Sequence, residues 1–187
     1  MEAVAKLEAF VYDQLKALKL PQLPKGLRTW VGDNVWWMAA ALAVLSALSA
    51  VSLIFGFMMA LGALAAPISA SWYVGAFAGW VLITNAIALT FAVLDAVVLG
   101  LAVNPLKESQ KKGWTFLFIL WLLSALSFAV NLLVSVLTLN IFGLIGTLIF
   151  GTIFLAIAVY FLFEIRGEFA HVEKSAGVKK RKTTKTK

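Results

Sequence analysis

Two long stretches of the chain contain no charged residue. The first lies between Asp33 and Asp95, and the second lies between Lys112 and Glu164. A helix needs only about 20 apolar residues to cross the roughly 30 Å hydrocarbon core of a bilayer, so each stretch is long enough for two crossings. Backbone polar groups inside lipid must be satisfied within the segment itself, which favours helices. The pattern therefore predicts an all-α integral membrane protein with four transmembrane helices in two hairpins.

Turn residues divide each stretch into two spans. The first hairpin is expected to bend at Pro67–Ser71, because proline has no amide hydrogen and small polar residues favour turns. The second is expected to bend at Asn140, shortly before Gly143. The predicted spans are about 35–66, 72–103, 114–139 and 141–163. They form a transmembrane domain, 34–163, between an N-terminal arm, 1–33, and a basic tail, 164–187.

The N-terminal arm carries apolar residues at helical spacing, which predicts an amphipathic helix that ends before Pro21. These residues are Val4, Leu7, Val11, Leu15 and Leu18. In one interpretation, the helix lies in the membrane interface or docks a partner. In the other, its apolar stripe folds onto the cytoplasmic ends of the bundle.

Charge gives the orientation of the predicted spans. All 16 basic residues fall in the arm, in the loop around 104–113 or in the tail, and four spans place these three segments on one side. The positive-inside rule then puts both termini in the cytoplasm or the equivalent compartment of an organelle. The composition agrees with this class, since 62% of residues are hydrophobic and the mean hydropathy is +0.94.

Catalytic motifs are not evident. The chain has no cysteine and a single histidine, and it contains no phosphate loop, dinucleotide fingerprint or zincin motif. A membrane enzyme generally needs several polar groups at one depth. We therefore expect no catalysis, no cofactor and no bound metal.

Asp95 is the one ionisable residue within a predicted span. An unpaired charge in lipid costs about 2.5–3.5 kcal/mol or more, which makes such a residue a candidate for transport or proton relay. The alternative is that Asp95 reaches cytoplasmic water or pairs with Lys107, Lys111 or Lys112. The other residues of a possible intramembrane polar site are Thr84, Asn85, Ser124, Ser127, Asn131 and Ser135. The polar stripe of the third span is either one wall of a hydrophilic path or hydrogen-bonded packing against the first span.

Small residues four apart predict close helix packing in the second and fourth spans, because they allow helix backbones to approach one another. They are Gly75, Gly79, Ala92, Ala96, Gly100, Gly143, Thr147 and Gly151.

The end of the tail is a short basic segment whose charge suits anionic lipid, an acidic protein or a nucleic acid. Its basic residues are Lys179, Lys180, Arg181, Lys182, Lys185 and Lys187. The alternative is a solvated tail that only enforces topology.

Three functions fit this pattern. The leading hypothesis is a non-catalytic accessory or scaffold subunit that packs against other membrane subunits or against copies of itself. The second is a small oligomeric channel or transporter that uses Asp95 and the polar stripe of the third span. The third is a membrane-shaping hairpin protein, similar in organisation, though not in any motif, to reticulon-type proteins.

Overall fold

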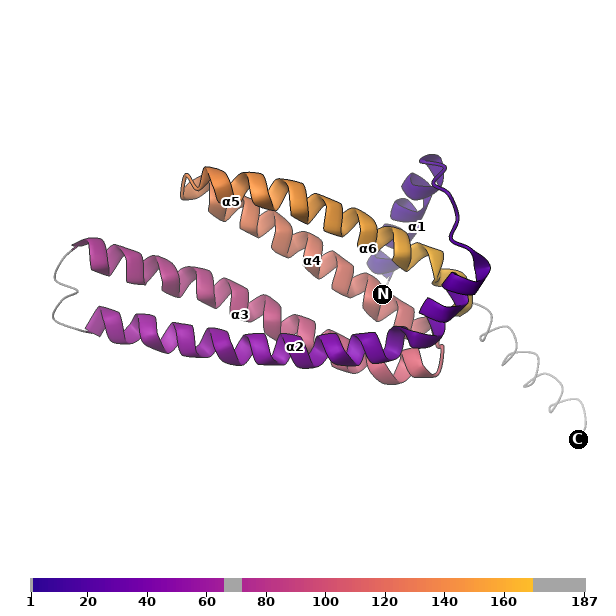
Figure 1. The fold of residues 1–187 in the computed structure, drawn as a ribbon, viewed down its shortest axis with the longest axis horizontal. Coiled ribbons are helices and arrows are strands. Elements are labelled where there is room, and N and C mark those ends of the chain that lie inside the picture. Colours follow the sequence, from indigo (N-terminus) through magenta and orange to yellow (C-terminus); the bar gives the residue numbers. More distant parts are fainter. Residues whose placement is uncertain (1, 66–71, 170–187) are drawn as a thin grey trace, which may run out of the picture. The chain divides into compact units, whose positions relative to one another are not determined.

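A computed structural model describes residues 2–65 and 72–169, and Figure 1 shows that these residues form helices joined by short connections. No strand occurs among them. The bend predicted at Pro67–Ser71 and the basic residues of the tail from Lys179 onward lie outside the described residues.

The first three helices are α1 (Glu2–Ala17), α2 (Lys25–Ala65) and α3 (Trp72–Lys107). At 41 residues, α2 is about 60 Å long, so it is longer than a bilayer core is thick. It begins at Lys25, upstream of the apolar run that starts near Val35. The apolar run therefore marks the part of α2 suited to lipid, and not the start of the helix.

α3 also runs beyond its predicted end near Val103. Asn104 and Pro105 belong to the helix, although a loop was expected to start there. The helix stops when Ser109 adopts a φ of 51°. The amide of Gln110 then donates to the carbonyl of Pro105 at 2.8 Å, and the amide of Ser109 donates to that of Leu106 at 2.9 Å. This pair of bonds is a Schellman motif, which closes the helix without glycine.

α4 (Lys111–Leu137) ends in the same way, with Leu139 at a φ of 52°. Asn140 then caps the next helix, because its side chain accepts the amide of Gly143 at 2.9 Å. The predicted second bend is thus confirmed at Asn140. The chain bends here because the left-handed backbone at Leu139 ends α4 and the Asn140 side chain caps the first turn of the next helix.

The last span is one helical run in three parts: α5 (Ile141–Gly146), a π-helical turn η2 (Thr147–Gly151) and α6 (Thr152–Glu164). A π turn inserts an extra residue into the helix and shifts the faces on either side of it. Here the turn ends where Gly151 meets the ring of Phe128 from α4. A methyl group at Gly151 would lie 2.5 Å from that ring, so a larger residue there would have to displace the ring.

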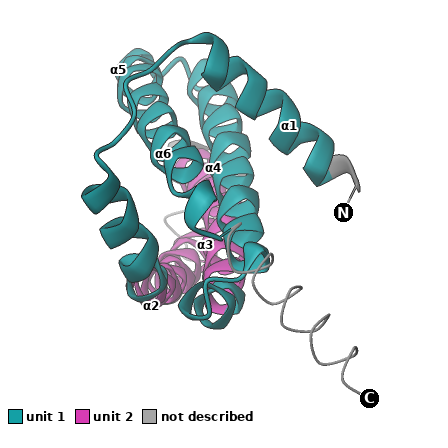
Figure 2. Cartoon of the chain, turned by 90° about the vertical axis from the view of Figure 1, so that its right-hand side faces the viewer, with its two compact units in different colours: residues 1–39, 101–187 teal, residues 40–100 magenta. Residues whose placement is uncertain are grey.

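The chain forms two compact units, which Figure 2 shows in different colours. The smaller unit is residues 40–100, and the larger unit combines residues 1–39 and 101–187. In the smaller unit, parts of α2 and α3 form a hairpin. The amide of Asn85 lies against Gly56, where an added methyl group would be 3.0 Å from Nδ2 of Asn85. This position therefore brings a polar residue of α3 against a glycine of α2.

The larger unit has its packed core around Trp114 and Phe118 of α4, which are 1% and 0% exposed. The two rings stack with centroids 5.6 Å apart. The Trp114 indole donates to the carbonyl of Leu162 at 2.8 Å, and the Trp121 indole donates to that of Leu155 at 3.0 Å. These bonds fasten α4 to α6, which run side by side (Figure 1).

The prediction of four spans is confirmed at the level of length and composition. Four helical runs are long and apolar enough to cross a bilayer: Lys25–Ala65, Gly75–Lys107, Lys111–Leu137 and Ile141–Phe169. Most of their apolar side chains face outward, as lipid-facing surfaces do. The fold is consistent with a multi-pass membrane protein.

Candidate functional site

Polar contacts between distant segments gather at one end of the larger unit, where α1 meets the end of α6. Glu8 of α1 is 8% exposed, and its carboxylate pairs with the guanidinium of Arg166. Around Glu8, α1 turns Val4, Val11 and Leu15 toward the unit. The buried face of α1 is therefore built around an ion pair that the apolar pattern did not reveal.

The apolar stripe of α1 is only partly covered. Leu7 and Leu18 were expected on the same stripe as Val11, but they are 45% and 66% exposed, and Phe10 beside them is 61% exposed. The face of α1 that is turned toward the unit is instead centred on Val4, Glu8 and Val11. α1 thus contacts its own unit and still presents an apolar edge.

Arg166 is held between aromatic rings. Its guanidinium carbon lies 5.0 Å from the ring centre of Tyr12 and 5.6 Å from that of Trp114. Such cation–π contacts are favourable within about 6 Å. Together with the Glu8 pair, they fix the position of the Arg166 side chain between α1 and α4.

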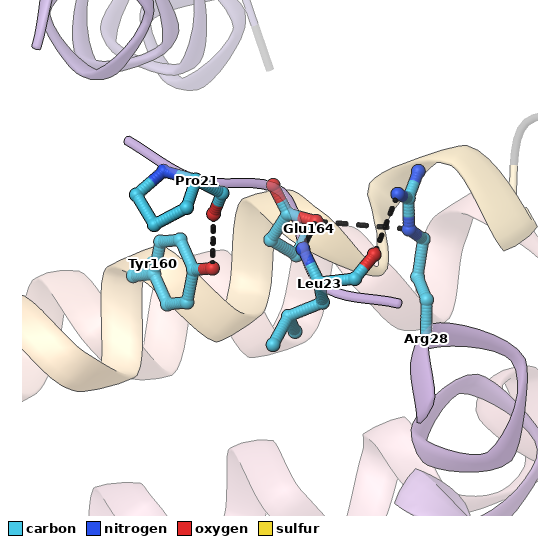
Figure 3. A network of polar contacts seen from close by, with 5 residues as sticks. All are labelled: Pro21, Leu23, Arg28, Tyr160 and Glu164. Atoms are coloured by element: carbon cyan, nitrogen blue, oxygen red, sulfur yellow. Dashed lines mark hydrogen bonds and ion pairs between the residues drawn. The ribbon is translucent and has the colours of Figure 1, made fainter. Parts of the chain in front are cut away.

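The connection between α1 and α2 is fastened to α6 by a second set of contacts, shown in Figure 3. Oε2 of Glu164 accepts the amide of Leu23 at 3.0 Å and lies 3.6 Å from Nε of Arg28. The Tyr160 hydroxyl donates to the carbonyl of Pro21 at 2.6 Å, and Arg28 donates to the carbonyl of Leu23 at 3.1 Å. Both Tyr160 and Glu164 come from the last turns of α6, so one helix end orients the whole connection.

A cavity of about 810 Å³ opens among these contacts. Three cationic side chains, Arg28, Lys111 and Arg166, line it together with one carboxylate, Glu164. The rest of its wall consists of Tyr12, Gln22, Trp114, Phe163, Gly167 and Phe169. A smaller cavity of about 240 Å³ shares Tyr12, Gln22, Phe163 and Glu164 and adds Lys16 and Lys19. This cavity pair is rich in cations and aromatic rings.

Asp95 lies in the smaller unit and is only partly exposed. Its Oδ1 is buried and has no hydrogen-bond partner among the described residues. Two of the loop lysines proposed as its partners contact aromatic rings, since Lys107 lies 5.4 Å from the ring centre of Trp36 and Lys112 lies 5.8 Å from that of Phe116. The predicted pairing of Asp95 stays a prediction.

The other polar residues of the spans hydrogen-bond mostly within their own helices. Thr84 donates to the carbonyls of Trp80 and Val81 at 3.1 and 3.2 Å. In the predicted stripe of α4, Asn131 donates to the carbonyl of Ser127 at 2.8 Å, while Ser135 is buried. Ser124 is part-buried on the same helix.

The glycines predicted to pack helices fall into two groups. Gly151 and Gly143 have close neighbours, the ring of Phe128 and the side chain of Asn140. By contrast, a methyl group at Gly79 or Gly100 would meet no atom within 4 Å. The same helix as Gly79 and Gly100, α3, also carries Gly75, Ala92 and Ala96. Thr147 is the first residue of the π turn.

No protein-family model, curated protein or solved structure matches this chain. The contacts of Glu8, Tyr160, Glu164 and Arg166 were not foreseen from the sequence. Glu164 and Arg166 are the first charged residues after an apolar run, which indicates that they lie at a helix end. That position does not indicate which residues they contact.

Proposed function

We propose that this chain is a non-catalytic membrane accessory subunit that works by packing against other membrane proteins. The observation that carries the proposal is that polar side chains in the spans form hydrogen bonds within their own helices. Thr84, Thr90, Asn131 and Thr138 each donate to carbonyls of their own helix, the last three at 2.8 Å. Polar groups satisfied in this way leave an apolar exterior suited to lipid or to another helix.

Open glycine positions support intermolecular packing. Gly79 and Gly100 of α3 have no neighbour within 4 Å of an added methyl group. Glycines on an open helix surface permit another helix to approach closely. Other membrane subunits are the proposed occupants of this surface, and copies of this chain are the alternative.

Native mass spectrometry after gentle detergent extraction from the native membrane tests the proposal. The expected result is a fixed stoichiometry with at least one other protein. Replacing Gly79 by Leu should weaken that association, whereas Gly26→Leu, at another open glycine near the start of α2, should leave it unchanged. A protomer that carries lipid alone would contradict the proposal.

Asp95 supports a second candidate, an oligomeric channel or transporter, because its Oδ1 is buried without a hydrogen-bond partner among the described residues. Intramembrane carboxylates of this kind often mark ion or proton paths. Asp95→Asn should then abolish flux in proteoliposomes at unchanged thermal stability. We expect instead that neither the wild type nor Asp95→Asn shows appreciable flux, and that the substitution only lowers thermal stability.

The tail beyond Gly177 is proposed as an electrostatic tether to anionic lipid. Its final basic residues would each contribute on the order of 1 kcal/mol near an anionic surface. Truncation after Gly177 should weaken binding to anionic vesicles, and the loss should be larger at low salt than at high salt, where ions screen the charges. Binding loss that is indifferent to salt would indicate a specific docking segment.

A further inference from the structure

The cavity lined by Arg28, Lys111 and Arg166 has more hydrogen-bond donors than acceptors. The ammonium group of Lys111 has no hydrogen bond or ion pair with any described residue, and neither has the side-chain amide of Gln22. Nε of Arg28 is buried and lacks a hydrogen-bond partner, because Oε2 of Glu164 lies 3.6 Å away. Lys111 and Gln22 are exposed, so these donors are accessible to an acceptor from outside the chain.

The one carboxylate of the wall is already engaged. Oε2 of Glu164 accepts the Leu23 amide and faces Arg28. Glu8, which pairs with Arg166, does not line the cavity. Lys111 is thus left as an uncommitted positive charge, and Lys16 and Lys19 of the adjoining cavity add to it. The electrostatics favour an anion.

Most of the remaining wall is aromatic, which distinguishes this cavity from a simple anion pocket. Tyr12, which is 40% exposed, and the partly buried Phe163 offer ring surface to a ligand, whereas Trp114 and Phe169 are each 1% exposed. A ligand that fits both parts carries a negative group joined to an apolar body. At about 810 Å³, the space is also large enough for such a ligand.

The position of the cavity indicates the source of that ligand. It lies where α6 ends and α4 begins, at one end of two helical runs apolar enough to cross a bilayer. Phospholipid headgroups lie at this depth, with acyl chains alongside the helices. Arginine and lysine are the usual partners of phosphate oxygens.

We propose that this cavity binds the phosphate of an anionic phospholipid, with Lys111 and Arg28 as its donors and the rings of Tyr12 and Phe163 beside its glycerol and first acyl carbons. Arg166 also lines the cavity, but its charge is paired with Glu8, so Lys111 and Arg28 are the main donors. The site does not depend on the accessory-subunit function, and it is distinct from the basic tail.

The test is a thermal-unfolding titration of the delipidated full-length protein in neutral detergent. The probes are a short-chain phosphatidylglycerol, a phosphatidylcholine with the same chains, and free glycerol phosphate. Phosphatidylglycerol should raise the Tm at lower concentration than the other two. Lys111→Gln should raise its half-maximal concentration about fivefold, as expected for loss of one cation near an anionic group.

Matched variants separate the site from general attraction. Lys112→Gln removes the same charge from the adjacent residue, whose ammonium lies over Phe116, and should shift the half-maximal concentration less than twofold. Lys111→Arg should bind as the wild type does. Gln22→Glu, which puts a carboxylate in the wall, should weaken binding, whereas Gln14→Glu on the exposed side of α1 should not.

Three results would overturn the proposal. Equal weakening by Lys111→Gln and Lys112→Gln would show non-specific attraction of lipid. Equal Tm shifts with phosphatidylcholine would remove the requirement for negative charge. Glycerol phosphate as effective as phosphatidylglycerol would show a site for a free anion, so that the lipid assignment would be wrong.

Discussion

Nε of Arg28 lies 3.6 Å from Oε2 of Glu164, which joins the start of α2 to the end of α6. The same oxygen accepts the amide of Leu23 at 3.0 Å. Both side chains are partly buried, with 26% and 17% of their surfaces exposed, so solvent screens this pair less than a surface ion pair. One carboxylate thus positions the connection that carries α1.

Replacing Glu164 should separate its two roles. Glu164→Ala removes the acceptor of the Leu23 amide and the partner of Arg28, so we expect the free energy of unfolding to fall by about 2 kcal/mol. Glu164→Gln keeps an acceptor for Leu23 and should cost about 1 kcal/mol or less. Equilibrium unfolding in mixed detergent micelles measures both. Glu108→Ala, at an exposed carboxylate in the α3–α4 turn, is the control and should change stability little.

Trp114 should matter more for stability than Trp121, although both indoles donate to carbonyls of α6. Trp114 is 1% exposed, and its acceptor Leu162 lies in the last turn of α6, where carbonyls lose their intrahelical donors. Trp114→Phe keeps a ring beside Phe118 but leaves this carbonyl without the indole donor, at a cost of about 1–2 kcal/mol. Trp121→Phe should cost less, because Leu155 lies in the first turn of α6, where the carbonyl also has an intrahelical donor. Equal losses in the same unfolding assay would show that the position of the carbonyl is unimportant.

Glycine-to-alanine substitutions should rank by the space at each site. A methyl group at Gly113 would lie 2.7 Å from the backbone nitrogen of Leu106, which cannot move without breaking the α3–α4 turn. We expect Gly113→Ala to destabilise the protein by about 2–3 kcal/mol. Gly151→Ala should cost less, because the Phe128 side chain that it meets can shift.

Gly146→Ala is the matched control for these substitutions, since nothing lies within 4 Å of an added methyl group there. Alanine is the better helix former by about 0.8–1 kcal/mol, so this change should leave stability unchanged or raise it. Thermal unfolding of the three variants gives the order. A loss at Gly146 as large as that at Gly113 would show that backbone space at Gly113 is not the cause.

Sequence reasoning succeeded where the signal was local or compositional. The charge-free runs predicted the four long apolar helices, and Asn140 with Gly143 predicted the second bend. It placed the helix ends less well, because the turns at Ser109 and Leu139 use left-handed backbone without the glycine that usually marks it. A loop was expected from Asn104 onward, yet the helix continues to Lys107.

The candidate site was predicted less well than the fold. The ion pair of Glu8 with Arg166 and that of Glu164 with Arg28 join residues far apart in the chain, and no periodicity specifies which charges meet. Their positions beside the apolar runs showed only that they lie near helix ends. Which charged residues pair depends on how α1 and α6 pack, and this packing cannot be predicted from the pattern of a single sequence.

The orientation of the chain is open to a direct test, because the protein has no native cysteine. Single cysteines at Ser69 and Asn140 should be labelled by an impermeant maleimide from one side of the membrane. Cysteines at Lys107 and Lys182 should be labelled only from the other, cytoplasmic side. The physical reason is that all 16 basic residues fall in the three segments that four spans place together, and basic loops are retained in the cytoplasm. Labelling of all four positions from the same side would refute the four-span topology, whereas labelling of Lys107 from the same side as Ser69 would show that α3 does not cross the membrane.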